Sequence, residues 1–379
     1  MNNVANAAEM TVAEVQAKHM EAIKSQKVEM VPAHELFGFQ QPMAGVGKLP
    51  VPVDAHPLTP VCDSDFVFPE GLVRRFLLSM QSRESIMLVG DKGTGKSSLV
   101  AQVHNRLNKP LLGINGSSGV DETHLLGSKT IEGGDVKSFD GVLSYAYRHG
   151  LSFLLDEVCT LRPGVLVGIN DFLQGDSVVT LKHHGINPEL DPRHLLSLGS
   201  GINIVKHPMF RLFATDNTGG KQSRDLRFAG TNGQNAAVRS RFTSFKVPFM
   251  APDKEMAALK KIATTLAASR KLEAVSDVEI RGMVEFALRF RKVFAAELAT
   301  DNISFRELKR WVTKRTIYGG DPAALDESFV DSLFTNLETL DQVQAMEQFE
   351  STFGRKLELP EEYSLSADKI CDGFTKKVA

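Results

Sequence analysis

A glycine-rich turn between an apolar run and a helical pattern constrains the fold of this chain more than any other feature. The apolar run covers residues 85–89, and apolar side chains at helical spacing follow from Lys96 to Leu107. The turn matches the pattern G-x-x-x-x-G-K-S in full. Together with the next residue it comprises Gly90, Asp91, Lys92, Gly93, Thr94, Gly95, Lys96, Ser97 and Ser98. This order of strand, loop and helix predicts a backbone that surrounds a phosphate group.

The residue types in the loop suit a nucleotide bound together with Mg²⁺. Its glycines allow the backbone to curl so that N–H groups point inward at phosphate oxygens. Lys96 is placed to neutralise the β- and γ-phosphates, and Ser97 can ligate Mg²⁺. A glycine-rich turn that arose by chance is the alternative, and the strand–loop–helix order argues against it. We therefore predict that the chain binds ATP and Mg²⁺.

An acidic pair follows a second apolar strand. Asp156 and Glu157 come directly after residues 152–155. A carboxylate at the end of a buried strand beside a phosphate loop is where the magnesium shell needs a ligand, which is the role predicted for Asp156. Glu157 is the predicted general base that polarises the attacking water. Two solvated charges where a strand emerges are the simpler interpretation, but the phosphate loop favours hydrolysis.

A polar side chain also ends a third apolar run, residues 210–214. Asn217 can hold the attacking water and sense the γ-phosphate, and Thr215 is the second possibility. An isolated Asn at such a place more often caps a turn. The position of Asn217 in the series of strand ends favours the sensing role.

Three arginines are candidates for contact with the γ-phosphate. Arg239 and Arg241 lie at the junction between a predicted helix and the last predicted strand. An exposed arginine there can reach the ATP of a neighbouring subunit as an arginine finger, with Arg241 the first choice and Arg239 the alternate. Two ordinary surface arginines are the other interpretation. Arg306 lies in a helix that begins at Ser304 with a capping box to Glu307, and it would point toward the same phosphate.

Composition excludes several classes of protein. Lysines and arginines (44) nearly balance aspartates and glutamates (46), which argues against a protein that coats nucleic acid. The cysteines Cys62, Cys159 and Cys371 fit neither a disulfide framework nor a zinc cluster, so we expect structural thiols. No stretch reaches the length of a membrane span, and residues 1–30 lack the apolar core of a secretory signal. We therefore expect a cytoplasmic protein.

The pattern of apolar residues changes along the chain. The expected fold class is α/β, with a parallel sheet flanked by helices and then an all-helical lid domain. Besides the strands above, residues 241–247 are expected to form a strand, and residues 254–269, 276–293, 304–316 and 326–353 to form helices. The expected divisions are an amphipathic helix within residues 1–30, an extended Pro/Gly-rich linker over 31–64, the nucleotide-binding core over 65–250, the lid over 251–360 and a polar tail over 361–379.

These motifs resemble those of the MoxR-like AAA+ ATPases, and within them the branch with the small ATPase subunit of aerobic cobaltochelatase and the CbbQ and NorQ activators. The resemblance runs from about residue 36 to residue 360. It is carried by residues 93–97, 154–157, 210–218 and 241–242, and in the lid by Ser304, Arg306, Trp311 and the Phe353-Gly354 turn. Phe305 departs from the family pattern, because it replaces the proline of a Ser-Pro-Arg motif in the lid.

The resemblance implies a hexameric ring of identical subunits with ATP between them. It implies Asn217 as first sensor, Arg241 as finger and Arg306 as second sensor. It also implies a pore-facing hairpin over residues 129–139 and a second hairpin over residues 177–205. The second hairpin contains His183, His184 and His194, for which solvated loop residues are a better interpretation than a metal site because their spacing is irregular.

The favoured function is an ATP-driven ring that remodels or activates a partner. By resemblance that partner is a separate von Willebrand A domain protein, as in a metal chelatase or enzyme-activation system. A nucleic-acid translocase in a defence or mobile-element system is the alternative, with Lys129 and Lys137 flanking the proposed pore hairpin. A scaffold that binds ATP without hydrolysing it is a third hypothesis, and Glu157 argues against it.

Overall fold

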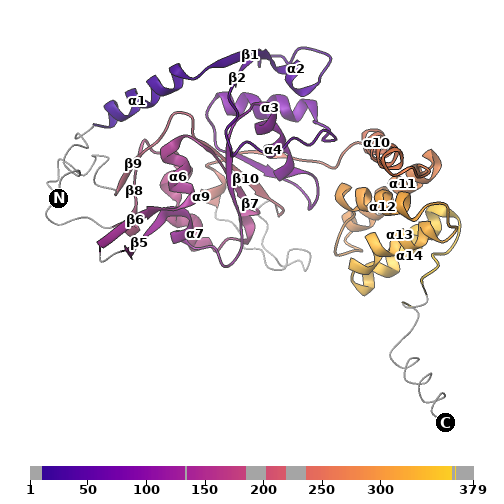
Figure 1. The fold of residues 1–379 in the computed structure, drawn as a ribbon. Coiled ribbons are helices and arrows are strands. Elements are labelled where there is room, and N and C mark those ends of the chain that lie inside the picture. Colours follow the sequence, from indigo (N-terminus) through magenta and orange to yellow (C-terminus); the bar gives the residue numbers. More distant parts are fainter. Residues whose placement is uncertain (1–10, 133–134, 185–201, 219–235, 361–362, 364–379) are drawn as a thin grey trace, which may run out of the picture. The chain divides into compact units, whose positions relative to one another are not determined.

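The computed structural model describes residues 11–132, 135–184, 202–218, 236–360 and 363 (Figure 1). The chain divides into two compact units, one comprising residues 1–91 and 95–248 and the other residues 92–94 and 249–379. The first contains a parallel sheet with helices on its faces, and the second is helical. This confirms the predicted fold class.

The central sheet of the first unit has five parallel strands in the order β11-β3-β10-β7-β4. They are β3 (Ile86–Val89), β4 (Leu111–Asn115), β7 (Ser152–Asp156), β10 (Arg211–Asp216) and β11 (Thr243–Lys246). The edge strand β4 was absent from the prediction because its apolar run is short and interrupted by Gly113. Packing favours glycine there, since a Cβ would lie 3.0 Å from the carbonyl oxygen of Leu154, closer than an ordinary van der Waals contact.

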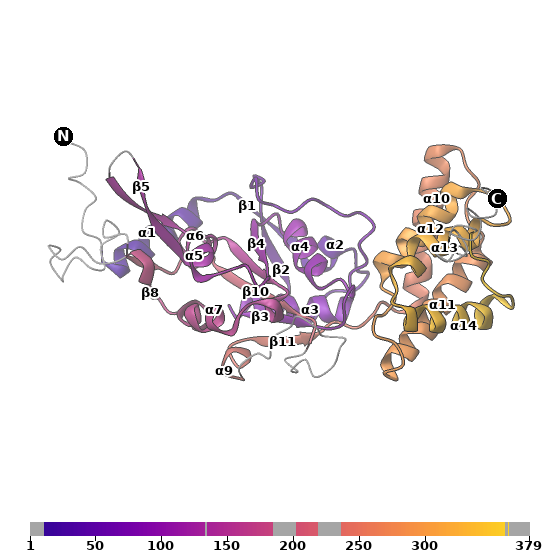
Figure 2. The ribbon, with the colours of Figure 1, turned by 90° about the horizontal axis from the view of Figure 1, so that it is seen from below.

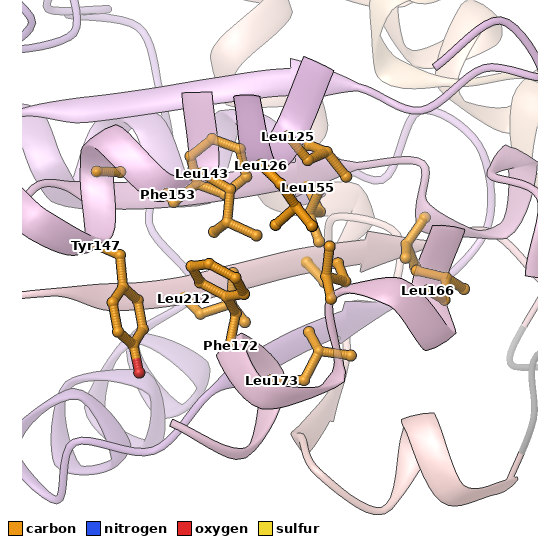
Figure 3. Close-up of a cluster of buried hydrophobic side chains, with 14 of the residues drawn as sticks. Leu125, Leu126, Leu143, Tyr147, Phe153, Leu155, Leu166, Phe172, Leu173 and Leu212 are labelled. Atoms are coloured by element: carbon orange, nitrogen blue, oxygen red, sulfur yellow. The ribbon is translucent and has the colours of Figure 1, made fainter. Parts of the chain in front are cut away.

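The sheet is buried on both faces, and successive strand residues alternate between two apolar clusters. In β7, Phe153 and Leu155 join one cluster while Leu154 joins the other. The first cluster includes residues of α5 (Glu122–Leu126), α6 (Val142–His149), α7 (Pro163–Gly168) and α8 (Asn170–Gln174), and Figure 3 shows part of it. The second includes residues of α3 (Glu70–Gln81) and α4 (Lys96–Arg106).

The expectation of an extended linker over residues 31–64 is wrong for its first half. Helix α1 (Val12–Ser25) ends before Met30, and β1 (Val28–Pro32) then pairs antiparallel with β2 (Lys48–Pro52) around α2 (Ala33–Phe37). Phe37 and Leu49 are buried in the same cluster as α3. The prolines that suggested a linker are tolerated because the ribbon has only two strands, and each of its strands is therefore an edge.

Two hairpins extend the first unit beyond its sheet. In one, β5 (Gly127–Glu132) pairs antiparallel with β6 (Asp135–Asp140), which confirms the hairpin predicted over residues 129–139; its tip, residues 133–134, lies outside the described residues. In the other, β8 (Val178–Thr180) pairs antiparallel with β9 (Asn203–Val205). This confirms the base of the second predicted hairpin, while residues 185–201, with His194, lie outside the described residues.

The second unit surrounds an aromatic core. Its helices are α10 (Pro252–Arg270), α11 (Asp277–Ala295), α12 (Phe305–Tyr318), α13 (Ala324–Ser332) and α14 (Thr339–Phe353). The single helix predicted over residues 326–353 is wrong, because a short 3-10 turn at Phe334–Asn336 separates two helices. A continuous helix would hold Phe329 and Phe349 about 30 Å apart. Their ring centroids lie 5.0 Å apart, because the reversal lets both helices contribute to one core.

Candidate active site

The predicted site residues of the first unit follow strands that are neighbours in the sheet. Strand β10 lies between β3 and β7, with Thr215 opposite Leu88 and Ala214 opposite Leu155. The strands are parallel, so their carboxyl ends meet at one edge. The phosphate loop after β3, Asn217 after β10 and the acidic pair at the end of β7 therefore converge there, which sequence alone did not establish.

The phosphate loop adopts a backbone that only glycine tolerates easily. Gly93 and Gly95 have φ angles of +76° and +84°, in the left-handed region, and Gly95 precedes the first residue of α4. The buried Lys96 ammonium donates to the carbonyl oxygens of Gly90 (2.8 Å) and Asp91 (2.7 Å). Burial lowers the pKa of Lys96, and nearby carboxylates oppose that effect. The loop thus presents a cation whose hydrogen bonds go to neutral backbone carbonyls.

The two residues predicted to hold Mg²⁺ are in direct contact. The Ser97 hydroxyl donates to Oδ1 of Asp156 at 2.5 Å, and the Thr215 hydroxyl donates to the same oxygen at 2.5 Å. A hydroxyl and a carboxylate are the hard oxygen donors that Mg²⁺ prefers, and it commonly takes only one or two protein ligands beside phosphate oxygens and water. Ser97 and Asp156 therefore fit a magnesium site.

The predicted base and the predicted sensor are also brought together. The side-chain amide of Asn217 donates to Oε1 of Glu157 at 3.4 Å. Glu157 has left-handed backbone angles of φ 52° and ψ 48°, which are uncommon for a residue with a Cβ. Its N–H donates to the Thr215 hydroxyl at 2.8 Å. Thr215, the second candidate for sensor, is buried with its hydroxyl engaged by the acidic pair, so Asn217 is better placed to contact water.

Two residues that shape this edge were missed from the sequence. A Cβ at Gly116 would lie 2.4 Å from the carbonyl oxygen of Glu157, and the Gly116 N–H donates to the carbonyl oxygen of Asp156 at 2.7 Å. Buried Asp216 accepts from the N–H and the hydroxyl of Thr218, both at 2.8 Å, and its carbonyl accepts from the Gly90 N–H at 3.1 Å. Gly116 directly follows β4, a strand that was absent from the prediction, so the glycine was missed as well. Asp216 was visible in the motif, but its burial depends on the assembled sheet.

The described cysteines, Cys62 and Cys159, are free thiols. Cys159, two residues after Glu157, is buried, and burial raises its pKa to about 11, so the thiol is protonated and poorly reactive at neutral pH. Cys62 is exposed and accepts a hydrogen bond from Arg106 at 2.7 Å. Cys371 lies outside the described residues.

Of the three candidate arginines, Arg241 is less exposed than expected. Arg239 ends α9 (Ala236–Arg239) and is exposed, whereas Arg241, the first choice for a finger, is half-buried and donates to the carbonyl oxygen of Ala237. Arg306 is exposed in the first turn of α12, where the predicted capping box between Ser304 and Glu307 is present in both directions.

Comparisons with known proteins agree with the motifs. A family model described as an AAA domain of the dynein-related subfamily matches residues 85–242. The chain is 27% identical over 332 residues to the aerobic cobaltochelatase subunit CobS of Sinorhizobium sp, with 86% of this chain and 91% of CobS covered. It is 27% identical to NorQ of Paracoccus denitrificans and to CbbQ of Hydrogenophilus thermoluteolus; these matches cover 51% and 48% of this chain, and 64% and 60% of the relatives.

Residues 85–242 match an AAA domain, and the chain is similar to the MoxR-like AAA+ ATPases. The family model covers the phosphate loop, the acidic pair, Asn217 and both candidate finger arginines. The similarity to CobS reaches well beyond that segment, since it extends over 86% of the chain. ATP hydrolysis is therefore the activity of this AAA+ ATPase, and the strand ends described above are where its chemistry is expected.

Of the three histidines predicted in the second hairpin, the structure describes the side chain of His184. His184 is buried, and its Nε2 lies 3.2 Å from the carbonyl oxygen of Phe139, which links the two hairpins. The expectation of solvated loop histidines is therefore wrong for His184. Within the described ranges, no group of three or more histidine, cysteine or acidic side chains could hold a metal ion.

Among the same residues, no helix combines the length and apolar character needed to cross a membrane.

Proposed function

We propose that this AAA+ ATPase assembles with copies of itself into a six-membered ring that remodels or activates a partner in the cytoplasm. The expected partner is a separate protein with a von Willebrand A domain, as in a metal chelatase or enzyme-activation system. The observation that carries the proposal is the similarity to the cobaltochelatase subunit, because it covers 91% of that protein and is not confined to the nucleotide-binding segment.

In this proposal each strand end has a chemical role. Lys96 binds the β- and γ-phosphates, and Ser97 and Asp156 hold Mg²⁺. Bound Mg²⁺ supplies positive charge that offsets the charge developing on the phosphate oxygens. Glu157 accepts a proton from the water that attacks the γ-phosphorus, and Asn217 orients that water. The bond between the γ-phosphorus and its bridging oxygen breaks, and ADP and phosphate leave.

In this proposal the ring provides a second source of positive charge at the transition state of ATP hydrolysis. An arginine from a neighbouring subunit can supply it, and a head-to-tail contact that repeats by rotation closes into a ring. Arg239 is exposed, and Arg241 is half-buried and would have to release the Ala237 carbonyl to make such a contact. Arg306 is proposed to act as second sensor from the lid.

The β5–β6 hairpin is the surface that we assign to partner contact. Figure 2 shows it projecting from the first unit. Ile131 is 75% exposed and Phe139 is 48% exposed. Exposed apolar side chains add little to the stability of a two-stranded hairpin, so stability does not account for them. Exposed apolar side chains on a projecting arm suit contact with a polypeptide.

The hairpin register counts against the nucleic-acid alternative. Lys129 lies opposite Ser138, and Lys137 lies opposite Thr130. Since paired residues share a face and successive residues alternate, the two lysines point to opposite faces. They do not form a one-sided basic surface of the kind that follows a phosphate backbone.

A mixing experiment tests the shared site. Arg241→Ala and Glu157→Gln should each hydrolyse ATP poorly alone, and an equimolar mixture should regain activity, because an intact site in one subunit then meets an intact arginine in the next. A mixture of Arg241→Ala with the double variant Glu157→Gln/Arg241→Ala is the matched control and should stay inactive. The same pair of mixtures with Arg239→Ala decides between the arginines. Failure of every mixture to exceed its control would argue against a site completed by a neighbour.

A trapping experiment tests the client. Glu157→Gln, loaded with ATP and Mg²⁺, is used to capture partners from the native host, with Lys96→Ala as a control that cannot hold nucleotide. A von Willebrand A protein or a chelatase subunit enriched only on the first variant would support the proposal. Nucleic acid together with nucleic-acid-processing enzymes, without such a partner, would favour the translocase.

A further inference from the structure

We infer that Thr215 is a positioning residue for ATP hydrolysis, because its buried hydroxyl fixes the Glu157 backbone and the Asp156 carboxylate at the same time. The inference rests on the roles proposed above for those two acids. Thr215 is fully buried in β10, so it acts through its neighbours rather than by touching the nucleotide or water.

The backbone of Glu157 needs such support. Its left-handed conformation is disfavoured for a residue with a Cβ and persists only where the surroundings impose it. Both peptide groups beside its Cα are held. The N–H donates to Thr215 at 2.8 Å, and the carbonyl oxygen accepts from the N–H and hydroxyl of Thr160 at 2.9 and 2.8 Å. These contacts set the direction in which the Glu157 carboxylate leaves the chain.

The same hydroxyl also orients the magnesium-side acid. A hydroxyl has one proton and two acceptor lone pairs. Thr215 gives its proton to Oδ1 of Asp156 and uses an acceptor position for the Glu157 N–H. Oδ1 receives a second hydrogen bond from Ser97, so its orientation is fixed by donors from two different elements. Thr215 thereby couples the position of the metal-side carboxylate to that of the base.

The inference predicts a specific pattern of kinetic change. Thr215→Val keeps the side-chain shape but removes both hydrogen bonds, so the base and the metal-side acid lose their fixed relation. We expect kcat to fall by about 10- to 100-fold while KM for ATP changes by less than about threefold, because the loss concerns orientation for reaction rather than nucleotide binding. Thr215→Ser retains the hydroxyl and should keep kcat within about threefold of the unchanged protein.

The experiment measures kcat, KM and the affinity for a non-hydrolysable ATP analogue on the full chain, with folding checked by circular dichroism. Thr316→Val is the matched control, because Thr316 is also a buried threonine but its hydroxyl donates only to the Val312 carbonyl within α12 (2.7 Å). Its kcat should be unchanged. If Thr215→Val does not fold, Thr160→Val tests the same support from the carbonyl side, with the same expected loss of kcat.

The outcomes separate this inference from the proposal on which it rests. Retained kcat in Thr215→Val, beside a strong loss in Glu157→Gln, would overturn the positioning role and leave the proposed site intact. Retained hydrolysis in Glu157→Gln would instead overturn the assigned base. A rise in KM with unchanged kcat in Thr215→Val, or failure of Thr215→Ser to rescue kcat, would also contradict the inference.

Discussion

Both units bury charged side chains, but they complete the hydrogen bonding of those charges in different ways. In the helical unit, the Arg291 guanidinium donates to both carboxylate oxygens of Glu255 at 2.8 and 3.0 Å and to the Ile303 carbonyl at 2.7 Å. In the first unit, the Lys96 ammonium donates to the carbonyl oxygens of Gly90 and Asp91. A buried cation paired with a carboxylate is neutralised within the fold, whereas one held by backbone carbonyls can be redirected to a substrate phosphate.

The largest expected effect comes from breaking the matched pair. Arg291→Met leaves Glu255 buried without its partner, which is expected to destabilise the helical unit by about 4 kcal/mol. Denaturant titration followed by fluorescence of Trp311 measures this, because it is the single tryptophan of the chain and is buried in the core of that unit.

Two further variants sharpen this test. The double variant Glu255→Met/Arg291→Met removes both charges and should recover most of the lost stability. Arg289→Met breaks a partly exposed pair with Glu285 and should cost less than about 1 kcal/mol. A loss as large in Arg289→Met as in Arg291→Met would contradict the distinction between buried and exposed charge.

In the first unit the acidic pair should affect chemistry rather than stability. Glu157→Gln keeps the size of an exposed side chain but removes the base, so kcat should fall by about 1000-fold, equivalent to about 4 kcal/mol of activation free energy. ATP affinity, measured by calorimetry, and the denaturation midpoint should remain close to those of the unchanged chain. A shift of the denaturation midpoint comparable to that of Arg291→Met would show that Glu157 stabilises the fold.

Acid should weaken the first unit selectively, because all ten histidines lie before residue 208. Burial lowers the pKa of His104 from 6.5 to about 4. Because the unfolded chain binds this proton more tightly, the stability contributed by neutral His104 is complete above about pH 6.5 and is lost as pH falls toward 4. The loss is on the order of 3 kcal/mol, since one pKa unit is worth about 1.4 kcal/mol. Burial also lowers the pKa of the half-exposed His207 to about 4, which adds a smaller effect in the same direction.

Hydrogen exchange of β3 and β10 peptides between pH 7 and pH 4, corrected for the intrinsic rate, would measure this loss, and Trp311 fluorescence would follow the helical unit in parallel. His104→Leu removes the buried titrating ring and should flatten the pH dependence of exchange in the first unit. An unchanged dependence in that variant would assign the acid sensitivity to other groups.

The smallest expected effect concerns helix starts in the second unit. Ser304→Ala removes the capping box of α12 and should cost about 1 kcal/mol of stability. Ser276→Ala removes the same arrangement from α11 and is the matched control, with a similar expected loss. Trp311 fluorescence during denaturation compares the two. A negligible change in both would show that packing alone fixes these helix starts.

Much of the site could be predicted because its pieces are local. The phosphate loop, the acid pair and the capping box of α12 each lie within a few consecutive residues, where glycine conformation, strand ends and helix caps act. Strand β4 was missed because its pattern is short and Gly113 looks like a break. The ribbon over residues 28–52 was missed because proline in an edge strand looks the same in sequence as proline in a linker.

The sequence by itself determined a nucleotide-binding α/β unit followed by a helical one, since periodicity and motif order encode these locally. Only the tertiary structure decided that Thr215 supports Glu157, that Arg241 folds back on Ala237, and that Phe349 returns to the core beside Phe329. Each of these depends on which distant or neighbouring segment occupies the space around a side chain. That is settled by sheet order and packing, which no local pattern carries.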